Sequence, residues 1–380
     1  MALQPGFKKF LTLVVAVGIA GGGFYAFKSG MLGHKSQTTI DTGYSAPPSA
    51  APAPSASPQA QPTPASFQPN ADTLQSILQN HTVRISVDNP SEPIYGETKD
   101  GVPHGFNYEF AQLLFAQPEF NKGGPITIDT HHEVGTYQDV PRQLLVASNG
   151  APAVDIAMDG LTYPDNTPNG VVYTNPYLDN FGYALVVQQG SPIHSAADLD
   201  GKTIGILRGD PDVRALVSHQ YPNSRLVDVS DEDTDFISKS IDGAVVNAFI
   251  YDYPFAVPLL KGTDLKFAVT KLDGSDISYK IGVRSSDTNL LIYLNSAIGR
   301  VKQSPAYLDL LRKYFISDQV VTTAATAGEH SYSVKHGDTL NLIASSQLGS
   351  GGRYVDIQRR NNLPNPNLIL AGQQLVIPSR

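Results

Sequence analysis

The sequence of 380 residues contains no cysteine. This absence excludes disulfides, thiolate zinc sites, iron–sulfur clusters and cysteine nucleophiles. It also excludes a lipid-anchored N-terminus of the bacterial lipoprotein kind, which needs a cysteine to acylate. It gives no information on the compartment, because an exported protein can do without disulfides.

Positive charge is also scarce, since 27 Lys and Arg stand against 35 Asp and Glu and give a net charge of −8. This balance argues against a nucleic-acid partner for the whole chain. Residues 1–80 hold four basic and two acidic residues, residues 81–317 hold 18 and 29, and residues 329–380 hold five and three. Three charge regimes in a chain of this length predict several structural parts.

Sequence motifs of catalysis and metal binding are missing as well. The chain has no G-x-S-x-G, P-loop or H-E-x-x-H pattern. His131 and His132 are adjacent, so they do not form a metal-binding pair on one helix face. The acidic run Asp228–Asp235 lacks the glycine-centred spacing of an EF-hand loop. We therefore expect no catalytic residue, no metal and no cofactor.

An apolar run from Phe10 to Phe27 follows Lys8 and Lys9 and ends at Lys28. Its 18 residues would span about 27 Å as a helix, enough for a bilayer core. A retained signal anchor and a cleaved signal peptide both fit this pattern. Because no small-x-small cleavage site follows a short apolar stretch, we favour the anchor. It predicts a cytoplasmic segment 1–9, a transmembrane helix 10–28 and a single-pass inner-membrane protein with its bulk in the periplasm.

Two segments read as linkers. Residues 29–72 are rich in Pro, Ala and Ser, with eight prolines between Pro47 and Pro69. Such a composition cannot bury a core and predicts a semi-extended tether. The second linker, residues 318–329, is short and rich in Thr and Ala, and it separates a last unit of residues 330–380.

Residues 73–317 alternate strand-like and helix-like runs, which predicts an α/β domain with mostly parallel sheets covered by helices. We expect helices at 110–120 and around 139–147. The expected strands are 82–87, 126–130, 154–158, 183–187, 203–206, 244–250, 266–270 and 281–283.

The last unit carries three closely spaced motifs: Tyr332–Leu340 (YSVKHGDTL), Asn361–Ile369 (NNLPNPNLI) and Ala371–Pro378 (AGQQLVIP). With them, residues 330–380 resemble a LysM domain, a small module that binds glycans containing N-acetylglucosamine. The resemblance implies a βααβ fold and peptidoglycan glycan strands as a partner. We also expect Asp338 to cap the first helix after a turn at Gly337.

The same resemblance implies a shallow glycan groove between two loops, 337–340 and 367–369. N-acetyl groups would lie against Leu340, Leu368 or Ile369 and hydrogen-bond to exposed backbone. The candidate glycan-binding residues are Gly337, Asp338, Thr339, Leu340, Asn367, Leu368 and Ile369. For the side chains of Asp338 and Thr339, helix capping alone is the alternative interpretation.

A second resemblance covers about 240 central residues. Its motifs are Val83–Asp88, Pro93–Tyr95, Gly105–Glu109, Asp155–Thr162, Thr174–Tyr177, Asp198–Ile206 and Asp242–Ala248. With them, residues 73–317 resemble the periplasmic solute-binding proteins of family 3, the polar amino-acid type. The resemblance implies a two-lobed periplasmic-binding-protein-like fold (type II), whose lobes close on a ligand about two crossing strands. Lobe 1 would hold about 80–180 and 270–317, and lobe 2 about 183–268.

The departures from this family concern the ligand carboxylate. The family usually has an Arg shortly after the position of Thr162, but the stretch 162–168 contains no basic residue. It usually has Ser or Thr at a second-lobe helix start, where this chain has Asp210 before Pro211. Asp252, which in the family receives the ligand amino group, and the aromatic residue Tyr95 are retained.

The expected ligand is therefore a neutral or cationic solute. The candidate ligand-binding residues are Tyr95, Asp159, Gly160, Thr162, Asp210 and Asp252. Turn and cap chemistry is the alternative for Asp159 and Asp210. A structural ion pair with a nearby basic group is the alternative for Asp252.

Together these features predict an α/β solute-binding-like protein with a LysM domain and an N-terminal transmembrane helix. It would bind a small solute or wall fragment for transport or sensing, with a membrane transporter or envelope protein as a further partner. Two alternatives stay open. One is a non-catalytic envelope scaffold with a degenerate solute-binding fold. The other is a dehydratase-like enzyme on that fold. It ranks below the other interpretations because it needs residues that bind a carboxylate, which this sequence lacks.

Overall fold

The computed structural model describes residues 72–88, 92–148, 150–162, 167–230, 235–316 and 324–379. They belong to one unit, Thr63–Arg380. The expected transmembrane helix 10–28 and all but the last residue of the 29–72 linker lie outside the described residues. Among the helices described, none has the length and apolar character needed to span a bilayer.

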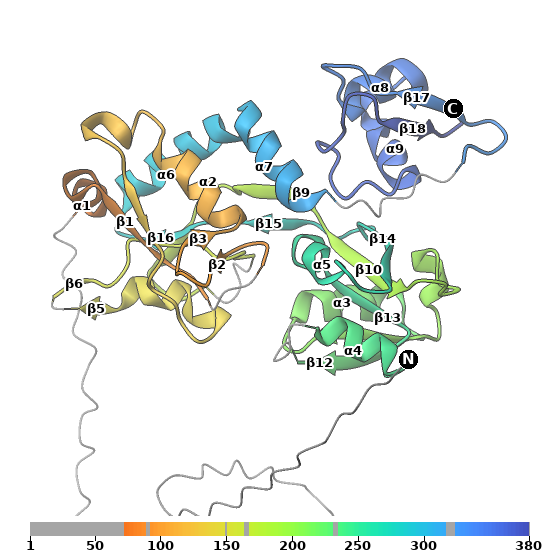
Figure 1. Cartoon of the computed structure of the whole chain (residues 1–380), viewed down its shortest axis with the longest axis horizontal. Coiled ribbons are helices and arrows are strands. Elements are labelled where there is room, and N and C mark those ends of the chain that lie inside the picture. Colours follow the sequence, from red (N-terminus) through yellow and green to blue (C-terminus); the bar gives the residue numbers. More distant parts are fainter. Residues whose placement is uncertain are drawn as a thin grey trace, which may run out of the picture. The chain divides into compact units, whose positions relative to one another are not determined.

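The first lobe is built on a five-stranded sheet in the order β4-β1-β7-β16-β8 (Figure 1). These strands are β4 (Thr127–Asp129), β1 (Thr82–Ser86), β7 (Ile156–Ala157), β16 (Gly282–Arg284) and β8 (Val171–Tyr173). Its helices are α1 (Thr73–Asn80), α2 (Phe106–Phe115), α6 (Thr288–Lys302) and α7 (Pro305–Phe315). Buried aromatic residues of α2 and α7, such as Phe106, Phe110 and Phe315, pack into its core.

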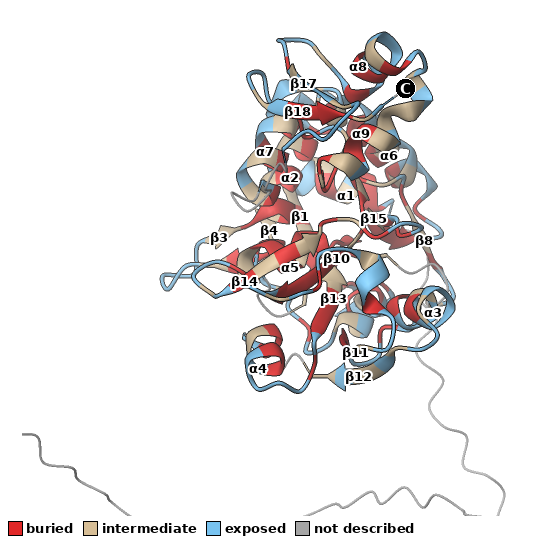
Figure 2. Cartoon of the chain, turned by 90° about the vertical axis from the view of Figure 1, so that its right-hand side faces the viewer, coloured by how far each residue is buried: buried red, intermediate tan, exposed pale blue. Residues whose placement is uncertain are grey.

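The second lobe has its own five-stranded sheet in the order β12-β11-β13-β10-β14. These strands are β12 (Arg225–Val229), β11 (Thr203–Leu207), β13 (Ala248–Asp252), β10 (Tyr183–Gln188) and β14 (Leu265–Val269). Its helices are α3 (Pro211–Gln220), α4 (Phe236–Asp242) and α5 (Tyr253–Leu259). The strands β10 and β13 carry mostly buried residues, coloured red in Figure 2, because helices and loops cover both faces of this sheet.

Two strands connect the lobes, β9 (Leu178–Phe181) and β15 (Ile277–Tyr279), which pair antiparallel. Figure 1 shows both of them between the two sheets. The chain enters the second lobe through β9 and returns to the first through β15. The prediction of two crossing strands is confirmed.

The prediction of mostly parallel sheets is wrong. Strand β1 is parallel to β4 and β7, and β11 is parallel to β12 and β13. The other four pairings, of β10 with β13 and β14 and of β16 with β7 and β8, are antiparallel. Both antiparallel strands, β10 and β16, directly follow a crossing between the lobes, so the crossing sets their direction.

Two predicted helices differ from the structure. Helix α2 begins at Phe106, directly after Gly105, and ends at Phe115, because Pro118 disfavours helical backbone before it. A side chain at Gly105 would come within 2.8 Å of the Ile94 carbonyl oxygen, so this start requires glycine. The region around 139–147 forms two short 3₁₀ helices, Tyr137–Asp139 and Pro141–Leu145.

The C-terminal unit has the βααβ order that the resemblance implies. Its elements are β17 (His330–Ser333), α8 (Leu340–Leu348), α9 (Tyr354–Arg360) and β18 (Gln374–Ile377), with a short 3₁₀ helix between α8 and α9. Strands β17 and β18 pair antiparallel. Both helices pack on this pair through a separate core that includes Val334, Ile343, Ile357 and Leu375.

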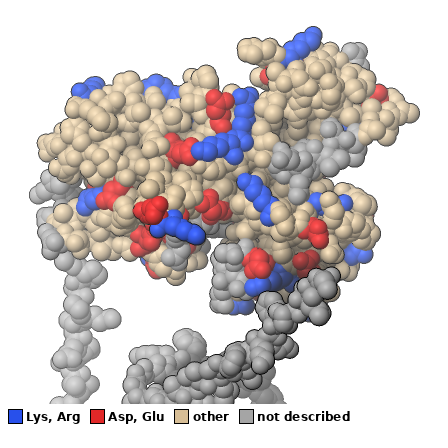
Figure 3. All heavy atoms as spheres, in the orientation of Figure 1, with Lys and Arg blue, Asp and Glu red and all other residues tan. Residues whose placement is uncertain are grey.

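Positive and negative charges are mixed on the described surface. On the face drawn in Figure 3, Lys and Arg side chains lie beside Asp and Glu side chains. Examples are Lys313 with Glu109 and Lys302 with Asp179, each with 2.6 Å between nitrogen and oxygen. This mixed surface is unlike the one-sided basic stripe of nucleic-acid-binding proteins.

Candidate functional site

A buried carboxylate, Asp159, stands at the end of the first lobe's sheet facing the other lobe. It follows β7, and its Oδ2 accepts the backbone N–H of Asp88 at 2.9 Å. Burial raises the pKa of Asp159 to about 7, although the hydrogen bond from Asp88 lowers it. Small changes in its surroundings therefore decide whether Asp159 is charged near neutral pH.

The turn after Asp159 uses its backbone to bind Tyr137. The Tyr137 hydroxyl donates to the Gly160 carbonyl oxygen at 3.2 Å and accepts the Thr162 N–H at 3.1 Å. Gly160 has a φ of +57°, and a methyl group added there would lie 3.2 Å from the Phe255 ring of α5. The two lobes therefore touch at this turn.

Asp252 is the matching carboxylate of the second lobe. It is the last residue of β13, and its Oδ2 accepts the hydroxyl of Tyr279 at 3.0 Å. Burial raises the pKa of Asp252 to about 7, and the negative charges of Asp210 and Asp212 add to this rise. Among the described residues no Lys, Arg or His forms an ion pair with Asp252, so the alternative of a structural ion pair finds no support there.

Tyr137 connects the two carboxylates electrostatically. Burial raises the pKa of the Tyr137 hydroxyl, and the charges of both Asp159 and Asp252 raise it further. Both carboxylates are thus close enough to act on one hydroxyl at the contact between the lobes. A cation between them would be stabilised by either charge.

Asp210 caps helix α3, as one of its two interpretations predicted. Its Oδ1 accepts the N–H groups of Asp212 at 3.1 Å and Val213 at 3.0 Å. Pro211 occupies the first helical position, where a missing N–H costs nothing. A ligand carboxylate arriving at this helix start would find its donors already used and a negative charge in front of them.

Tyr95 does not present an aromatic wall in this structure, because it is only 1% exposed. Its hydroxyl hydrogen-bonds to Glu97 Oε1 at 2.6 Å and to Thr130 Oγ1 at 3.1 Å, all within the first lobe. The aromatic side chains at the contact between the lobes are instead Tyr137, Phe255 and Tyr279. No local pattern in the sequence marks these three, since their role depends on the packing of distant segments.

A cavity of about 200 Å³ opens beside these groups. It combines first-lobe residues with the start of α3 in the second lobe, and its lining is Tyr137, Gln138, Pro141, Arg142, Leu161, Tyr173, Gly209 and Pro211. Arg142 is the basic residue of this lining, and its guanidinium pairs with Asp139 at 3.1 Å. The cavity therefore offers room for a small solute beside Tyr137 and the start of α3, and neither Asp159 nor Asp210 belongs to its lining.

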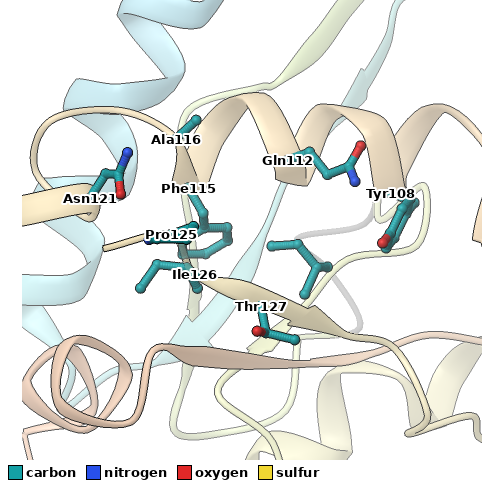
Figure 4. Close-up of a pocket in the computed structure, with 9 residues that line it drawn as sticks. Tyr108, Gln112, Phe115, Ala116, Asn121, Pro125, Ile126 and Thr127 are labelled. Atoms are coloured by element: carbon teal, nitrogen blue, oxygen red, sulfur yellow. The ribbon is translucent and has the colours of Figure 1, made fainter. Parts of the chain in front are cut away.

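A second hollow, of about 270 Å³, lies between α2 and the edge strand β4, where Tyr108, Gln112 and Phe115 meet Ile126 and Thr127 (Figure 4). None of its lining residues is charged. The two carboxyl groups whose pKa burial raises to about 7, Asp159 and Asp252, lie at the contact between the lobes instead, so this contact is the candidate site.

In the C-terminal unit, the residue that caps α8 lies one position after the expected Asp338. Thr339, not Asp338, caps α8 by accepting the Leu342 N–H at 3.2 Å. Asp338 Oδ2 instead accepts the Lys335 N–H at 2.8 Å and the Tyr332 hydroxyl at 2.9 Å, which stabilises the turn at Gly337. Both residues are capping candidates by type, and only the backbone geometry separates them.

The apolar members of the expected glycan groove are buried. Leu340 and Ile369 belong to the unit's own core, and Leu368 packs into the core of the solute-binding lobes. Gly337, Thr339 and Asn367 are exposed. Sugar contacts at the two loops would therefore depend on backbone groups and on these exposed positions.

Comparison with known proteins agrees with both parts. The family of bacterial extracellular solute-binding proteins, family 3, matches residues 83–317, and the LysM domain matches residues 332–378. A protein of Escherichia coli K12 named as an ABC transporter arginine-binding protein is 27% identical over 249 residues, covering 62% of this chain and 90% of that protein. The histidine-binding periplasmic protein of Salmonella typhimurium is 26% identical over 244 residues, covering 62% and 88%.

Solved structures show the same fold. An ancestral cationic amino acid solute-binding protein superposes with a TM-score of 0.51 and 21% identity, covering 64% of this chain and all of that one. The cysteine-binding protein from Campylobacter jejuni gives a TM-score of 0.50 and 21% identity, covering 66% and 97%. The chain thus belongs to the bacterial extracellular solute-binding proteins of family 3 and carries a C-terminal LysM domain.

Proposed function

We propose that this protein binds a small cationic or neutral solute between its two lobes. The observation that carries the proposal is that two buried carboxylates, Asp159 of the first lobe and Asp252 of the second, both act on the Tyr137 hydroxyl at the contact between the lobes and have no ion-pair partner among the described residues. Asp210 adds negative charge where relatives of this family would seat a ligand carboxylate. The names of the arginine-binding and histidine-binding relatives agree with a ligand that bears a positive charge.

A charge series tests this proposal. Calorimetry would compare L-glutamate, L-glutamine, L-arginine and the diamine putrescine, after a thermal-shift screen that adds sugars and muropeptides. A ligand at 100 times its Kd adds about 2.7 kcal/mol to the free energy of unfolding, which the screen detects. We expect putrescine, which has no carboxylate, to bind, L-arginine to bind more weakly because its carboxylate meets the charge of Asp210, and L-glutamate not to bind. Tight binding of L-glutamate would refute the proposal.

A second candidate function is a scaffold that no longer binds a solute. The packing of Phe255 against the turn at Gly160 favours it, because this ring fills space at the contact between the lobes. The same screen separates the two functions. If neither the charge series nor the muropeptides bind, the scaffold function is favoured.

For the other parts of the chain, the proposal is that LysM binds peptidoglycan glycan strands and that residues 10–28 hold the protein in the inner membrane. Deleting residues 330–380 should release the protein from sedimenting sacculi, and equal sedimentation without them would contradict this role. A reporter that works only in the cytoplasm, fused after Ser45, should be silent. Activity of that fusion would contradict the anchor and the periplasmic location of the bulk.

A further inference from the structure

The LysM domain contacts the solute-binding domain through the segment that follows α9. Asn362, which has a φ of +49°, accepts the Thr270 N–H on its Oδ1 at 2.7 Å. The Thr270 hydroxyl donates to the Asn362 carbonyl oxygen at 2.7 Å. Thr270 directly follows β14 and is 1% exposed, so both of its backbone and side-chain donors are used in a buried contact.

A second contact reaches one of the crossing strands. Asn365, also 1% exposed, donates from Nδ2 to the carbonyl oxygen of Asp179 in β9 at 3.0 Å. Arg359 forms an ion pair with Asp273, with 3.0 Å between nitrogen and oxygen. A buried amide group is costly unless it finds a partner, and the partner of the buried Asn365 Nδ2 lies in the other domain.

The apolar part of the contact is Leu368. It is 5% exposed and packs with the core of the solute-binding lobes, whereas its neighbour Ile369 packs inside LysM. The loop 367–369 is one wall of the groove in which LysM is expected to hold sugars. One wall of that groove is therefore turned toward the chain's own solute-binding domain.

We propose that docking of LysM on the solute-binding domain and binding of a glycan strand at the loop 367–369 exclude each other. The proposal rests on the proposed function, in which LysM binds glycans containing N-acetylglucosamine. An N-acetyl group could reach Leu368 of this loop only in molecules whose LysM domain has left Thr270 and Asp179. The apparent affinity for glycan would then be the intrinsic affinity multiplied by the fraction of molecules that are undocked.

A reversible covalent lock tests the exclusion in the full chain. The natural sequence has no cysteine, so the two introduced thiols would be the only ones in the double variant Thr270→Cys with Asn362→Cys. Oxidation should join the two thiols and abolish binding of a soluble chitin hexasaccharide, as calorimetry would measure. Adding a reductant should restore the binding. Each single cysteine variant is the control and should bind equally under both conditions. Failure of the disulfide to form would contradict docking, and equal binding by the oxidised and reduced forms would overturn the exclusion.

The opposite change should open the loop. Thr270→Arg places a long charged side chain in the contact, and we expect it to tighten binding of the hexasaccharide by about fivefold or more. Thr127→Arg, at an exposed position of β4, is the matched control and should leave the affinity unchanged. An unchanged affinity of Thr270→Arg would overturn the proposal. If no form binds the sugar, glycan binding by LysM is wrong and the exclusion fails with it, while the yield of the disulfide still reports docking.

Discussion

The hydroxyl of Tyr279 donates a hydrogen bond of 3.0 Å to Oδ2 of Asp252. Tyr279 ends β15, one of the two strands that cross between the lobes, and Asp252 ends β13 in the second lobe. The Asp252 carboxylate, which would bind a ligand cation, is therefore hydrogen-bonded to β15, a strand about which the lobes would move. A single donor from a hydroxyl does not neutralise a buried carboxylate, so a ligand cation would complete its environment.

The first prediction concerns the charge of Asp252. Asp252→Asn should weaken L-arginine binding by about tenfold or more, because a hydrogen bond to a charged group contributes about 1.5–3 kcal/mol. Calorimetry at pH 8 measures the change. Asp264→Asn, at an exposed position of the same lobe, is the control and should bind as the natural protein does. L-arginine binding that survives Asp252→Asn unchanged would contradict the assigned role.

The pH dependence of stability gives the second prediction. The pKa of Asp252 is about 7 in the folded protein and near 3.8 in the unfolded chain. Between these values the folded state holds a proton that the unfolded state has released, so the contribution of Asp252 to stability falls as the pH rises from about 4 to about 7. Asp252→Asn removes this loss. Urea unfolding without ligand should therefore show the variant more stable than the natural protein at pH 8.

At pH 5 the same comparison should give a much smaller difference, because Asp252 is then protonated and close to an asparagine in charge and shape. The change in the difference between the two pH values is the quantity to measure, since groups common to both proteins cancel. An equal difference at pH 5 and pH 8 would contradict the raised pKa.

The third prediction separates backbone strain from crowding at Gly160. Gly160→Ala should lower the free energy of unfolding by about 1 kcal/mol from its positive φ alone. Crowding should lower the free energy of unfolding further, because the added methyl group would lie 3.2 Å from the Phe255 ring. Gly209→Ala is the matched control, since Gly209 has a φ of +82° and no atom within 4 Å of an added methyl group. Equal losses in the two variants would show that Phe255 does not press on the turn.

The features predictable from the sequence are those fixed by neighbouring residues. The cap at Asp210 follows from an acidic residue directly before a proline at a helix start, and its partners are two and three residues away. The cap at Asp338 was wrong by one position, because Asp338 and Thr339 are equally suitable by type and the turn selects Thr339.

The features that could not be predicted depend on segments far apart in the chain. Tyr137 and Phe255 meet the turn at Gly160 only after both lobes have formed and come together. Likewise, the direction of β16 depends on the second crossing between the lobes, and strand patterns carry no information on it. The burial of Leu368 depends on a contact between domains, whereas its sequence surroundings match those of an exposed sugar-binding loop.

The last prediction uses Asp210 to separate its cap from its charge. Asp210→Ser should keep the hydrogen bonds to the N–H groups of Asp212 and Val213 and so preserve the stability of α3, whereas Asp210→Ala should cost about 0.5–2 kcal/mol. Both variants remove a charge that raises the pKa of Asp252, so both should lower that pKa. Asp252 would then stay ionised at lower pH, and the pH at which L-arginine binding is half lost should fall in both variants, as calorimetry from pH 5 to pH 8 would measure. Because the serine variant changes the charge with little change in stability, a fall seen only in the alanine variant would mean that loss of the helix cap is responsible, and would contradict the electrostatic coupling between Asp210 and Asp252.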